Sequence, residues 1–200
     1  TPISSYSERT RAVIKVQEGC NQFCTYCIIP YARGPIRSRS LEDIVAEVKR
    51  LADAGYREIV LTGIHITSYG RDTGDVDLIT LIEDIHDIEG IERIRLGSLE
   101  PNYIDSEFIK RICNLPKMCP HYHISLQSGS DSTLKRMGRR YTSSEYRDIV
   151  KNLRKANPDV SITTDVMVGF PGETDSEFNE TYDFVEDISF SKIHVFQYSP

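Results

Sequence analysis

Residues 12–27 of the chain read AVIKVQEGCNQFCTYC, a stretch that predicts a strand followed at once by three closely spaced cysteines. Similar apolar segments recur along the chain, and the predicted strands are Ala12–Gln17, Glu58–Gly63, Arg93–Ser98, Tyr122–Gln127, Ser161–Gly169 and Lys192–Gln197. Their first residues lie 46, 35, 29, 39 and 31 positions apart. This spacing leaves room for a helix in each connection and is typical of strand–helix units joined by right-handed crossovers.

Amphipathic helices are predicted between these strands. Apolar residues recur at helical spacing in residues 41–52, 78–85, 108–112, 146–153 and 178–185. Ser40 offers an N-cap to the first of these helices, and Thr174 with Glu177 resembles a capping box before the last. Strands that alternate with helices imply a parallel sheet. Because a complete eightfold barrel needs roughly 250 residues, we predict an α/β fold with a partial, six-stranded (β/α)6 TIM-like barrel. An open doubly wound sheet is the alternative.

Length and composition bound the class of protein. The chain has 200 residues, of which 39% are hydrophobic and 27% charged, and this indicates one globular domain, neither disordered nor fibrous. No apolar run approaches the ~18 residues of a transmembrane helix, and the first ten residues, TPISSYSERT, lack the apolar core of a secretory signal. We therefore expect a cytoplasmic protein without membrane contact. Its net charge of −6 disfavours unaided binding of nucleic acid, unless a local basic patch is present.

The strongest chemical signal is the CxxxCxxC run at residues 20–27. The chain has five cysteines, an odd number, and three of them lie in this run. With no export signal, such clustering points to metal or cluster ligands rather than disulfides. Three thiolates hold three irons of a [4Fe–4S] cluster and leave the fourth iron open. The alternative is structural zinc, which needs four ligands. The other candidates, Cys113 and Cys119 with His121 and His123 nearby, have a poor spacing for zinc.

A CxxxCxxC run after the first strand of a βα barrel resembles the signature of the radical S-adenosylmethionine enzymes. In that family three cysteines, here Cys20, Cys24 and Cys27, bind the cluster, and the amino and carboxylate groups of S-adenosylmethionine chelate the open iron. An electron from the cluster then cleaves the sulfonium to give a 5′-deoxyadenosyl radical. The resemblance therefore implies two cofactors, a [4Fe–4S] cluster and S-adenosyl-L-methionine. It also puts the loop at the C-terminal end of a barrel strand, where barrel enzymes carry their functional groups.

Further motifs resemble the methylthiotransferase branch of that family, whose members insert a sulfur and a methyl group into an unactivated C–H bond. They span residues 11–200 and comprise EGC (18–20), IPYARG (29–34), RSR (37–39), LTGIH (61–65), SLEP (98–101), LQSGS (126–130), MGRRY (137–141), GFPGET (169–174) and YSP (198–200). The GIH and SLEP motifs resemble the sub-branch that methylthiolates C2 of N6-threonylcarbamoyladenosine at position 37 of tRNA. The isopentenyladenosine-tRNA and ribosomal-protein enzymes tend instead to show Gly-Gln-Asn and Ala-Gln-Asp after the second strand.

The resemblance also implies which residues surround S-adenosylmethionine. Expected at this cofactor are Tyr26, Gly63, Glu100, Gln127, Ser128, Arg139, Arg140, Asp165, Val195 and Phe196. Some of these have plainer alternatives: an ordinary turn at Gly63, and core packing at Val195 and Phe196. One of the two adjacent arginines is equally interpreted as a solvated residue. Asp165 stands out from the sequence itself, because an acid inside an apolar strand is costly unless it is paired.

A basic stretch follows the cysteine loop and is the best candidate for a phosphate contact. It consists of Arg33, Arg37 and Arg39, and the resemblance makes these arginines, together with His65, candidates for contact with substrate RNA. A solvated loop is the alternative for the arginines, and a hydrogen-bonded structural histidine is the alternative for His65.

Full-length methylthiotransferases resemble this chain only in their middle. We expect residues 1–200 to form the radical SAM core domain, without the N-terminal domain that carries a second [4Fe–4S] cluster and without the C-terminal RNA-binding β-barrel. Cys113 and Cys119 lack the pattern of that N-terminal domain and are interpreted as packed or incidental thiols. The core alone is expected to bind one cluster and S-adenosylmethionine but not to complete sulfur insertion.

Partners and rival functions follow from the same resemblance. In the full-length protein, tRNA and an electron donor of the flavodoxin or ferredoxin type are implied, and the chain is expected to be a monomer. One alternative keeps radical chemistry but changes the substrate to isopentenyladenosine tRNA or a ribosomal-protein side chain. Another is a zinc-stabilised RNA-interaction module without catalysis.

Overall fold

The computed structural model describes residues 11–199. The N-terminal stretch 1–10, interpreted above as no secretory signal, and Pro200, the last residue of the YSP motif, lie outside the described residues. Six strands occur where the sequence predicts them: β1 (Arg11–Glu18), β3 (Glu58–Gly63), β4 (Arg93–Leu96), β5 (His121–His123), β6 (Ser161–Val168) and β7 (Lys192–Gln197). The prediction for the fourth of them was too long, because regular pairing in β5 stops at His123 and continues only as isolated bridges at Ile124 and Gln127.

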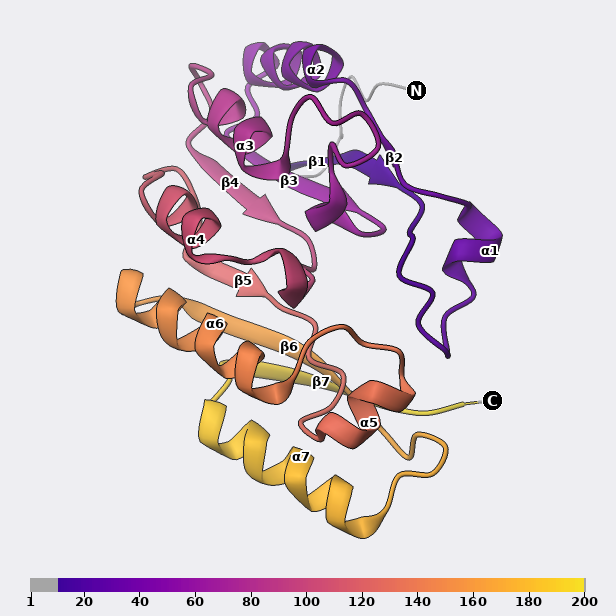
Figure 1. Cartoon of the computed structure of the whole chain (residues 1–200). Helices are drawn as coiled ribbons and strands as arrows, with labels where there is room; N and C mark the ends of the chain where they lie inside the picture. Colours follow the sequence, from indigo (N-terminus) through magenta and orange to yellow (C-terminus); the bar gives the residue numbers. More distant parts are fainter. Residues whose placement is uncertain (1–10, 200) are drawn as a thin grey trace.

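The six predicted strands follow one another in chain order around a curved wall (Figure 1). One sheet has the order β2-β1-β3-β4 and the other β5-β6-β7. Every neighbouring pair is parallel except β1 with β2 (Arg37–Ser38), a short antiparallel strand. Isolated parallel bridges, Ile94 to Met118 and Leu99 to Ile124, join the two sheets. Among the six parallel strands the order does not reverse at any point, as it would in a doubly wound sheet. The predicted partial barrel is therefore confirmed.

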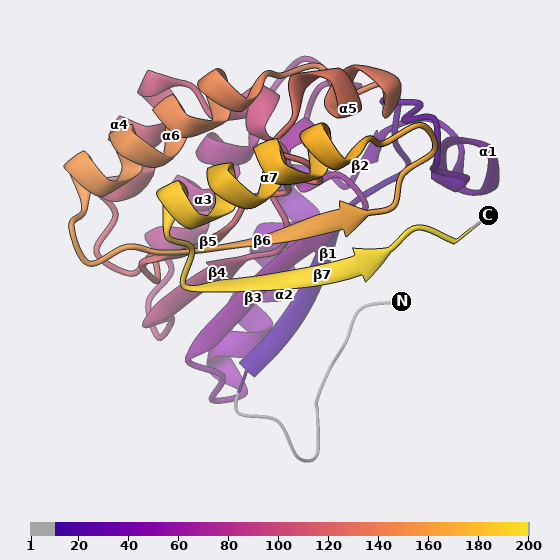
Figure 2. The same ribbon diagram turned by 90° about the horizontal axis from the view of Figure 1, so that it is seen from below.

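Helices cover one side of this wall (Figure 2). The long ones are α2 (Leu41–Asp53), α3 (Leu78–His86), α4 (Ser106–Cys113), α6 (Ser143–Ala156) and α7 (Asp175–Ile188). Shorter pieces follow other strands: α1 (Ile29–Arg33), α5 (Asp131–Arg136) and the 3₁₀ turns η1 (Ile66–Ser68) and η2 (Pro101–Tyr103). No helix in the described part of the chain is both long enough and apolar enough to cross a membrane.

The helix ends confirm the capping residues read from the sequence. The Ser40 hydroxyl accepts a hydrogen bond from the Asp43 N–H at the start of α2. Thr174 and Glu177 form the full capping box of α7, in which each side chain accepts from the other residue's backbone N–H. Such a cap satisfies N–H groups that the first helical turn leaves unpaired. A second capping box, Thr142 with Glu145, starts α6.

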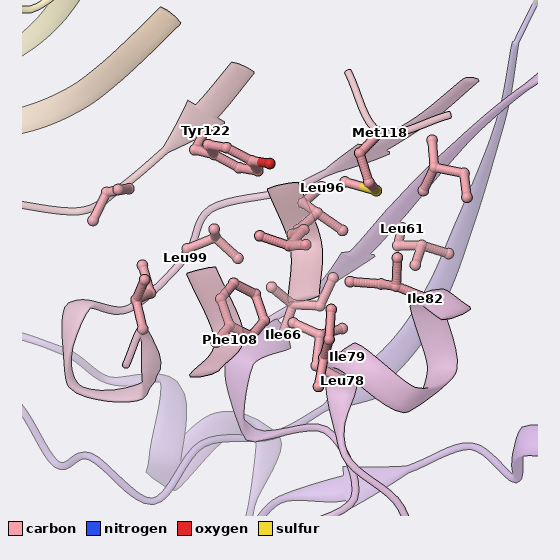
Figure 3. Close-up of a cluster of buried hydrophobic side chains, with 14 of the residues drawn as sticks. Leu61, Ile66, Leu78, Ile79, Ile82, Leu96, Leu99, Phe108, Met118 and Tyr122 are labelled. Carbon is pink, nitrogen blue, oxygen red and sulfur yellow. The ribbon is translucent and has the colours of Figure 1, made fainter. Parts of the chain in front are cut away.

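The core lies between the sheet and its covering helices. Figure 3 shows Leu61 and Leu96 of the sheet packed against Leu78, Ile79 and Ile82 of α3. In β6, Thr164 points toward α6, because its hydroxyl and that of Tyr146 both donate to the Ile124 carbonyl. Its neighbours Thr163 and Asp165 therefore point to the opposite side of the sheet, since successive side chains of a strand alternate.

Candidate functional site

The cysteine loop leaves the C-terminal end of β1 through a sharp turn. Gly19 has a φ of +73°, and a Cβ there would lie 1.9 Å from the carbonyl oxygen of Pro35. Only glycine therefore fits at this position. The Cys20 N–H donates to the Gly34 carbonyl at 3.1 Å, and the Cys27 N–H donates to the Cys24 carbonyl at 2.9 Å. These contacts fold the loop back on itself and hold its three cysteines at one end of the barrel.

A buried glutamine at the end of β1 fixes the start of this loop. The Gln17 amide donates to the carbonyls of Glu18 and Gly19, each at 2.7 Å, and accepts from the His65 N–H at 2.7 Å. Gly63 makes room for it, because a Cβ at Gly63 would lie 2.8 Å from the Gln17 Oε1. The structure thus gives Gly63 a packing role beside Gln17. Sequence reasoning missed Gln17, although a polar residue closing an apolar strand was a usable signal.

The thiol groups receive hydrogen bonds that suit negatively charged sulfur. The Gln22 N–H donates to the Cys20 Sγ at 3.4 Å, and the Arg139 Nη1 donates to the Cys24 Sγ at 3.4 Å. Burial raises the pKa of the Cys20 thiol, and negative charge on Cys24 and Cys27 raises it further. Cys20 is therefore a good thiolate only when a cation compensates the charge, as in a metal centre.

The three sulfurs do not lie as close together as the ligands of a single ion. In a tetrahedral zinc site the sulfurs lie about 3.8 Å apart, because each Zn–S bond is about 2.3 Å. Among the described residues, one group has three ligand atoms within 4.8 Å of one another, and it contains none of these cysteines. A [4Fe–4S] cluster spreads its ligands wider, one thiolate to each iron. Cys20, Cys24 and Cys27 are thus the residues that would hold it.

A buried ion pair lies beside the loop. The Arg139 Nη2 donates to the Glu100 Oε2 at 2.7 Å, and the two side chains are only 7% and 8% exposed. The Arg139 Nε also donates to the Tyr141 hydroxyl at 3.1 Å. Burial raises the pKa of Glu100, and the charge of Arg139 opposes that rise. A single guanidinium therefore connects the end of the third parallel strand with the Cys24 sulfur.

Aromatic rings form another wall of the site. Tyr26 packs edge to face on Phe170, with ring centroids 6.1 Å apart, and Phe170 packs in the same way on Tyr198 at 5.5 Å. Burial raises the pKa of the Tyr26 hydroxyl to about 12. The rings bring the cysteine loop next to the turn after β6 and the residues after β7. They provide an apolar surface of the kind that stacks on a flat heterocycle.

His65 lies in a buried polar group under the loop. Its ring packs edge to face on Tyr103 at 5.4 Å, and its Nε2 lies 3.5 Å from the Gln22 Nε2. Burial, together with the charges of Arg139 and Arg71, lowers the pKa of His65 to about 4. The ring is therefore neutral near pH 7. Its backbone N–H bond to Gln17 gives His65 a structural role beside the one expected from the sequence.

The remaining residues expected at the cofactor lie in different surroundings. The Ser128 hydroxyl is completely buried and lies 3.0 Å from the Thr181 hydroxyl of α7. Gln127 has a φ of +67°, and its backbone pairs with β6. Val195 and Phe196 are exposed on the edge strand β7. Asp165 lies between two histidines rather than beside the cysteine loop.

The arginines differ in how firmly they are held. Arg139 is buried in the site, whereas the neighbouring Arg140 makes no side-chain hydrogen bond or ion pair within the described residues. In the basic stretch, Arg39 pairs with Glu47 at 2.7 Å, and Arg33 lies 3.4 Å from Glu18. Arg37 donates only to backbone carbonyls. Arg33 and Arg37 thus remain the more available cations of this stretch.

Comparison with known proteins adds an independent line of argument. The family model described as the Radical SAM superfamily matches residues 14–185. The threonylcarbamoyladenosine tRNA methylthiotransferase of Bacillus subtilis is 48% identical over 198 residues, which cover 98% of this chain and 44% of that protein. The tRNA-2-methylthio-N(6)-dimethylallyladenosine synthase of Thermoanaerobacter pseudethanolicus is also 48% identical, over 94% of this chain and 40% of that protein. The chain therefore spans less than half the length of these curated relatives.

Solved structures share the fold. The radical S-adenosylmethionine methyltransferase TsrM of Kitasatospora setae, determined with cobalamin and a [4Fe-4S] cluster bound, superposes with a TM-score of 0.75 over 93% of this chain and 36% of that chain, at 19% identity. Methylornithine synthase superposes with a TM-score of 0.65 over 95% of this chain and 53% of that chain, at 12% identity. At these identities the likeness concerns the barrel alone.

Proposed function

The chain belongs to the radical SAM superfamily, whose enzymes use a [4Fe–4S] cluster and S-adenosylmethionine, and on this premise we propose that it is the catalytic core of a tRNA methylthiotransferase. The family and its two cofactors are those that the sequence predicts. The proposal adds the reaction, transfer of a methylthio group to C2 of an adenosine at position 37. It rests on similarity to relatives that carry such names over nearly the whole of this chain.

For the substrate we propose N6-threonylcarbamoyladenosine. Overall identity does not separate this nucleoside from the dimethylallyl one, because a relative named for each is 48% identical to the chain. The argument rests instead on the residues Gly63-Ile64-His65 at the end of β3 and on Glu100-Pro101 after the third parallel strand. These residues border the cysteine loop through Gln17 and Arg139. We therefore expect these residues to distinguish the two nucleosides close to the cysteine loop.

The chain's own residues would hold the cofactors and exclude water. Cys20, Cys24 and Cys27 would bind three irons, and Gln17 keeps their loop in place. Arg139 presents a fixed positive charge that suits the carboxylate of S-adenosylmethionine, and Glu100 an acceptor that suits its amino group or ribose. Tyr26 and Phe170 offer the apolar wall for its adenine. When bound, the two cofactors supply a one-electron cleavage that yields a carbon radical.

The rest of the reaction belongs to the whole protein in this proposal. Residues 1–200 would form the radical SAM core, and the parts that supply sulfur and grip tRNA would lie outside this stretch. The net charge of −6 supports a separate RNA-binding part. Arg33 and Arg37 would meet phosphate at the mouth of the site. An electron donor of the flavodoxin or ferredoxin type would reduce the cluster in the cytoplasm.

The observation that carries the proposal is the thiolate loop with its guanidinium donor. We expect anaerobic reconstitution to give four irons and four sulfides per chain, and reduction with S-adenosylmethionine to release 5′-deoxyadenosine. C20A, C24A and C27A should each abolish both, because three thiolates are needed to hold the cluster. C113A is the matched control and should change neither. Stoichiometric zinc in place of iron, or full turnover in the three variants, would refute the proposal.

Substrate choice needs the full-length protein. We expect methylthiolation of tRNA that carries the threonylcarbamoyl group at position 37 and none of tRNA that lacks it. Methylthiolation of dimethylallyladenosine tRNA alone would keep the reaction but overturn the proposed substrate.

A further inference from the structure

Three side chains with metal-binding groups meet on the side of the sheet opposite to the helices. His123 ends β5, Asp165 lies in β6 and His194 lies in β7, directly opposite Asp165 in the parallel register. Figure 2 shows α6 and α7 on one side of β6 and β7, and Asp165 points to the other side, as the alternation with Thr164 requires. The three residues are 42 and 29 positions apart in the sequence, so only the strand register brings them together.

The distances within this trio are those of ligands around one ion. The His123 Nε2 lies 3.2 Å from the Asp165 Oδ2, and the His194 Nδ1 lies 3.1 Å from the Asp165 Oδ1. All three ligand atoms lie within 4.8 Å of one another. Around a metal with bonds of about 2.0–2.2 Å, neighbouring ligand atoms lie about 3.0–3.5 Å apart. The trio therefore needs little rearrangement to surround an ion.

A hydroxyl behind His123 orients its ring. The His123 Nδ1 lies 3.0 Å from the Thr163 Oγ1, and Thr163 is 8% exposed. If the Nδ1–H donates to this hydroxyl, the Nε2 lone pair faces Asp165 and is available to a cation. Metal-binding histidines commonly use their second nitrogen in this way, and the partner fixes the tautomer. The His121 Nε2 contacts the same hydroxyl at 3.1 Å and extends the arrangement to a third histidine.

The charge of Asp165 supports a cation at this place. No lysine or arginine in the described part of the chain forms an ion pair with its carboxylate, whose side chain is 25% exposed. A half-buried carboxylate is costly unless an opposite charge compensates it. His194 is 43% exposed and His123 only 14%, so the trio is open on one side. An ion there would keep free positions for water or for an oxygen or nitrogen of a ligand.

We propose that His123, Asp165 and His194 form a mononuclear site for a divalent transition-metal ion of the Zn²⁺ or Fe²⁺ type, separate from the cysteine loop. Two imidazoles and one carboxylate suit such ions, whereas the three thiolates suit an iron–sulfur cluster. The site would link β5, β6 and β7 on the side of the sheet opposite to α6 and α7. It does not depend on the proposed tRNA reaction.

The test titrates the cluster-loaded protein with Zn²⁺ in a calorimeter under anaerobic conditions. We expect one Zn²⁺ per chain. H194A and D165N should weaken this binding at least about 10-fold, because even the loss of an outer partner of a metal ligand commonly costs 10–100-fold. H86Q, which changes a histidine outside the trio, is the matched control and should bind as the wild type does. Binding of equal strength and stoichiometry in the wild type, H194A and D165N would overturn the proposal, as would no binding to the wild type.

A second readout guards against loss of folding in the variants. Zn²⁺ should raise the Tm of the wild type and of H86Q, because an ion that binds only the folded state stabilises it by mass action. H194A lies on an exposed edge strand and should keep a wild-type circular dichroism spectrum without gaining Tm from Zn²⁺. Co²⁺ in place of Zn²⁺ should give weak visible bands without thiolate charge transfer. An equal rise in Tm for wild type and H194A would place the ion elsewhere.

Discussion

Replacing Arg139 with methionine should destabilise the folded chain by several kcal/mol and free the Cys24 sulfur. Methionine retains much of the side-chain volume but removes three interactions: the ion pair with Glu100, the hydrogen bond to the Tyr141 hydroxyl and the hydrogen bond to Cys24. Both members of the ion pair are less than a tenth exposed. The substitution therefore leaves a buried carboxylate without its partner.

The expected magnitude follows from that burial. Breaking a buried ion pair by removing one partner costs about 3–5 kcal/mol, because the other charge stays desolvated. For a domain of this size each kcal/mol lowers the Tm by roughly 2–4 °C. The Tm of R139M should thus fall by roughly 6–20 °C. E100Q should cost less, because the guanidinium keeps its bonds to Tyr141 and Cys24.

The loss should also depend on pH. Burial raises the pKa of Glu100 above its usual value of 4.5, so the folded state takes up a proton more readily than the unfolded state does. The stability that this group contributes is therefore fully present below pH 4.5, and it is lost as the pH rises from 4.5 through the raised pKa of the folded state. Arg139 opposes this rise of the Glu100 pKa, so in R139M the pKa should be higher and the loss of stability should continue to higher pH. The deficit of R139M should be larger at pH 8 than at pH 5.

The assay is anaerobic thermal unfolding, followed by circular dichroism, of the wild type, R139M, E100Q and the double variant R139M/E100Q at both pH values. The double variant should lose less than the sum of the single losses, because each single change leaves a buried group without its partner. Strict additivity of the two changes, or a loss below about 1 kcal/mol in R139M, would show that the pair behaves like an exposed one and would refute the reasoning.

Three further outcomes are expected. G63A should cost about 1–3 kcal/mol in chemical unfolding, because the new methyl group meets the buried Gln17 side chain; an unchanged midpoint would contradict the close packing. T174A should cost about 1 kcal/mol, because it removes one half of the capping box of α7; S132A, outside any cap, is the control, and equal stability of the two variants would argue against the cap. The pKa of His65 is lowered to about 4, so the folded state disfavours the protonated ring, and stability should fall as the pH drops from 6.5. By pH 4 this loss should reach about 3 kcal/mol, and H65Q should lack it; parallel pH curves for the two proteins would contradict the lowered pKa.

The sequence predicted the bounds of a strand correctly where the apolar pattern of that strand alone determines them. Glu58–Gly63 and Lys192–Gln197 have the bounds that the apolar pattern predicts. The strand predicted at Tyr122–Gln127 is regular only over His121–His123, and beyond it the pairing is reduced to isolated bridges at Ile124 and Gln127, where Gln127 has a positive φ. The short strand β2 was not predicted, since two residues carry no period. Local pattern therefore gave the order of the barrel, and backbone turns set by tertiary contacts did not follow from it.

The residues of the site likewise differ in whether local sequence could predict them. The three cysteines are close in the sequence, so their spacing alone predicted a common centre. Gln17 escaped notice because its long-range partner, His65, is reached only after β3 has paired with β1. Asp165 was singled out as an acid that needs a partner, but its partners could not be named, because His123 and His194 meet it through strand register. The sequence therefore identifies an acid whose burial is unfavourable without a partner, whereas only the fold shows which residues are its partners.

The buried polar residues around the cysteine loop differ from the apolar residues that fill the rest of the core. The hydrophobic core is filled mainly by leucine and isoleucine, which stabilise the fold without needing hydrogen-bond partners (Figure 3). At the loop, the side chains of Gln17, Glu100 and Arg139 are buried, and each depends on a polar partner. Apolar side chains of similar volume would often be neutral or more stable than such a pair, yet they would leave the Cys24 sulfur without a donor. The retained polar pair is therefore best explained by what it holds, because Arg139 supplies the hydrogen bond to the Cys24 sulfur and Glu100 holds Arg139 in place.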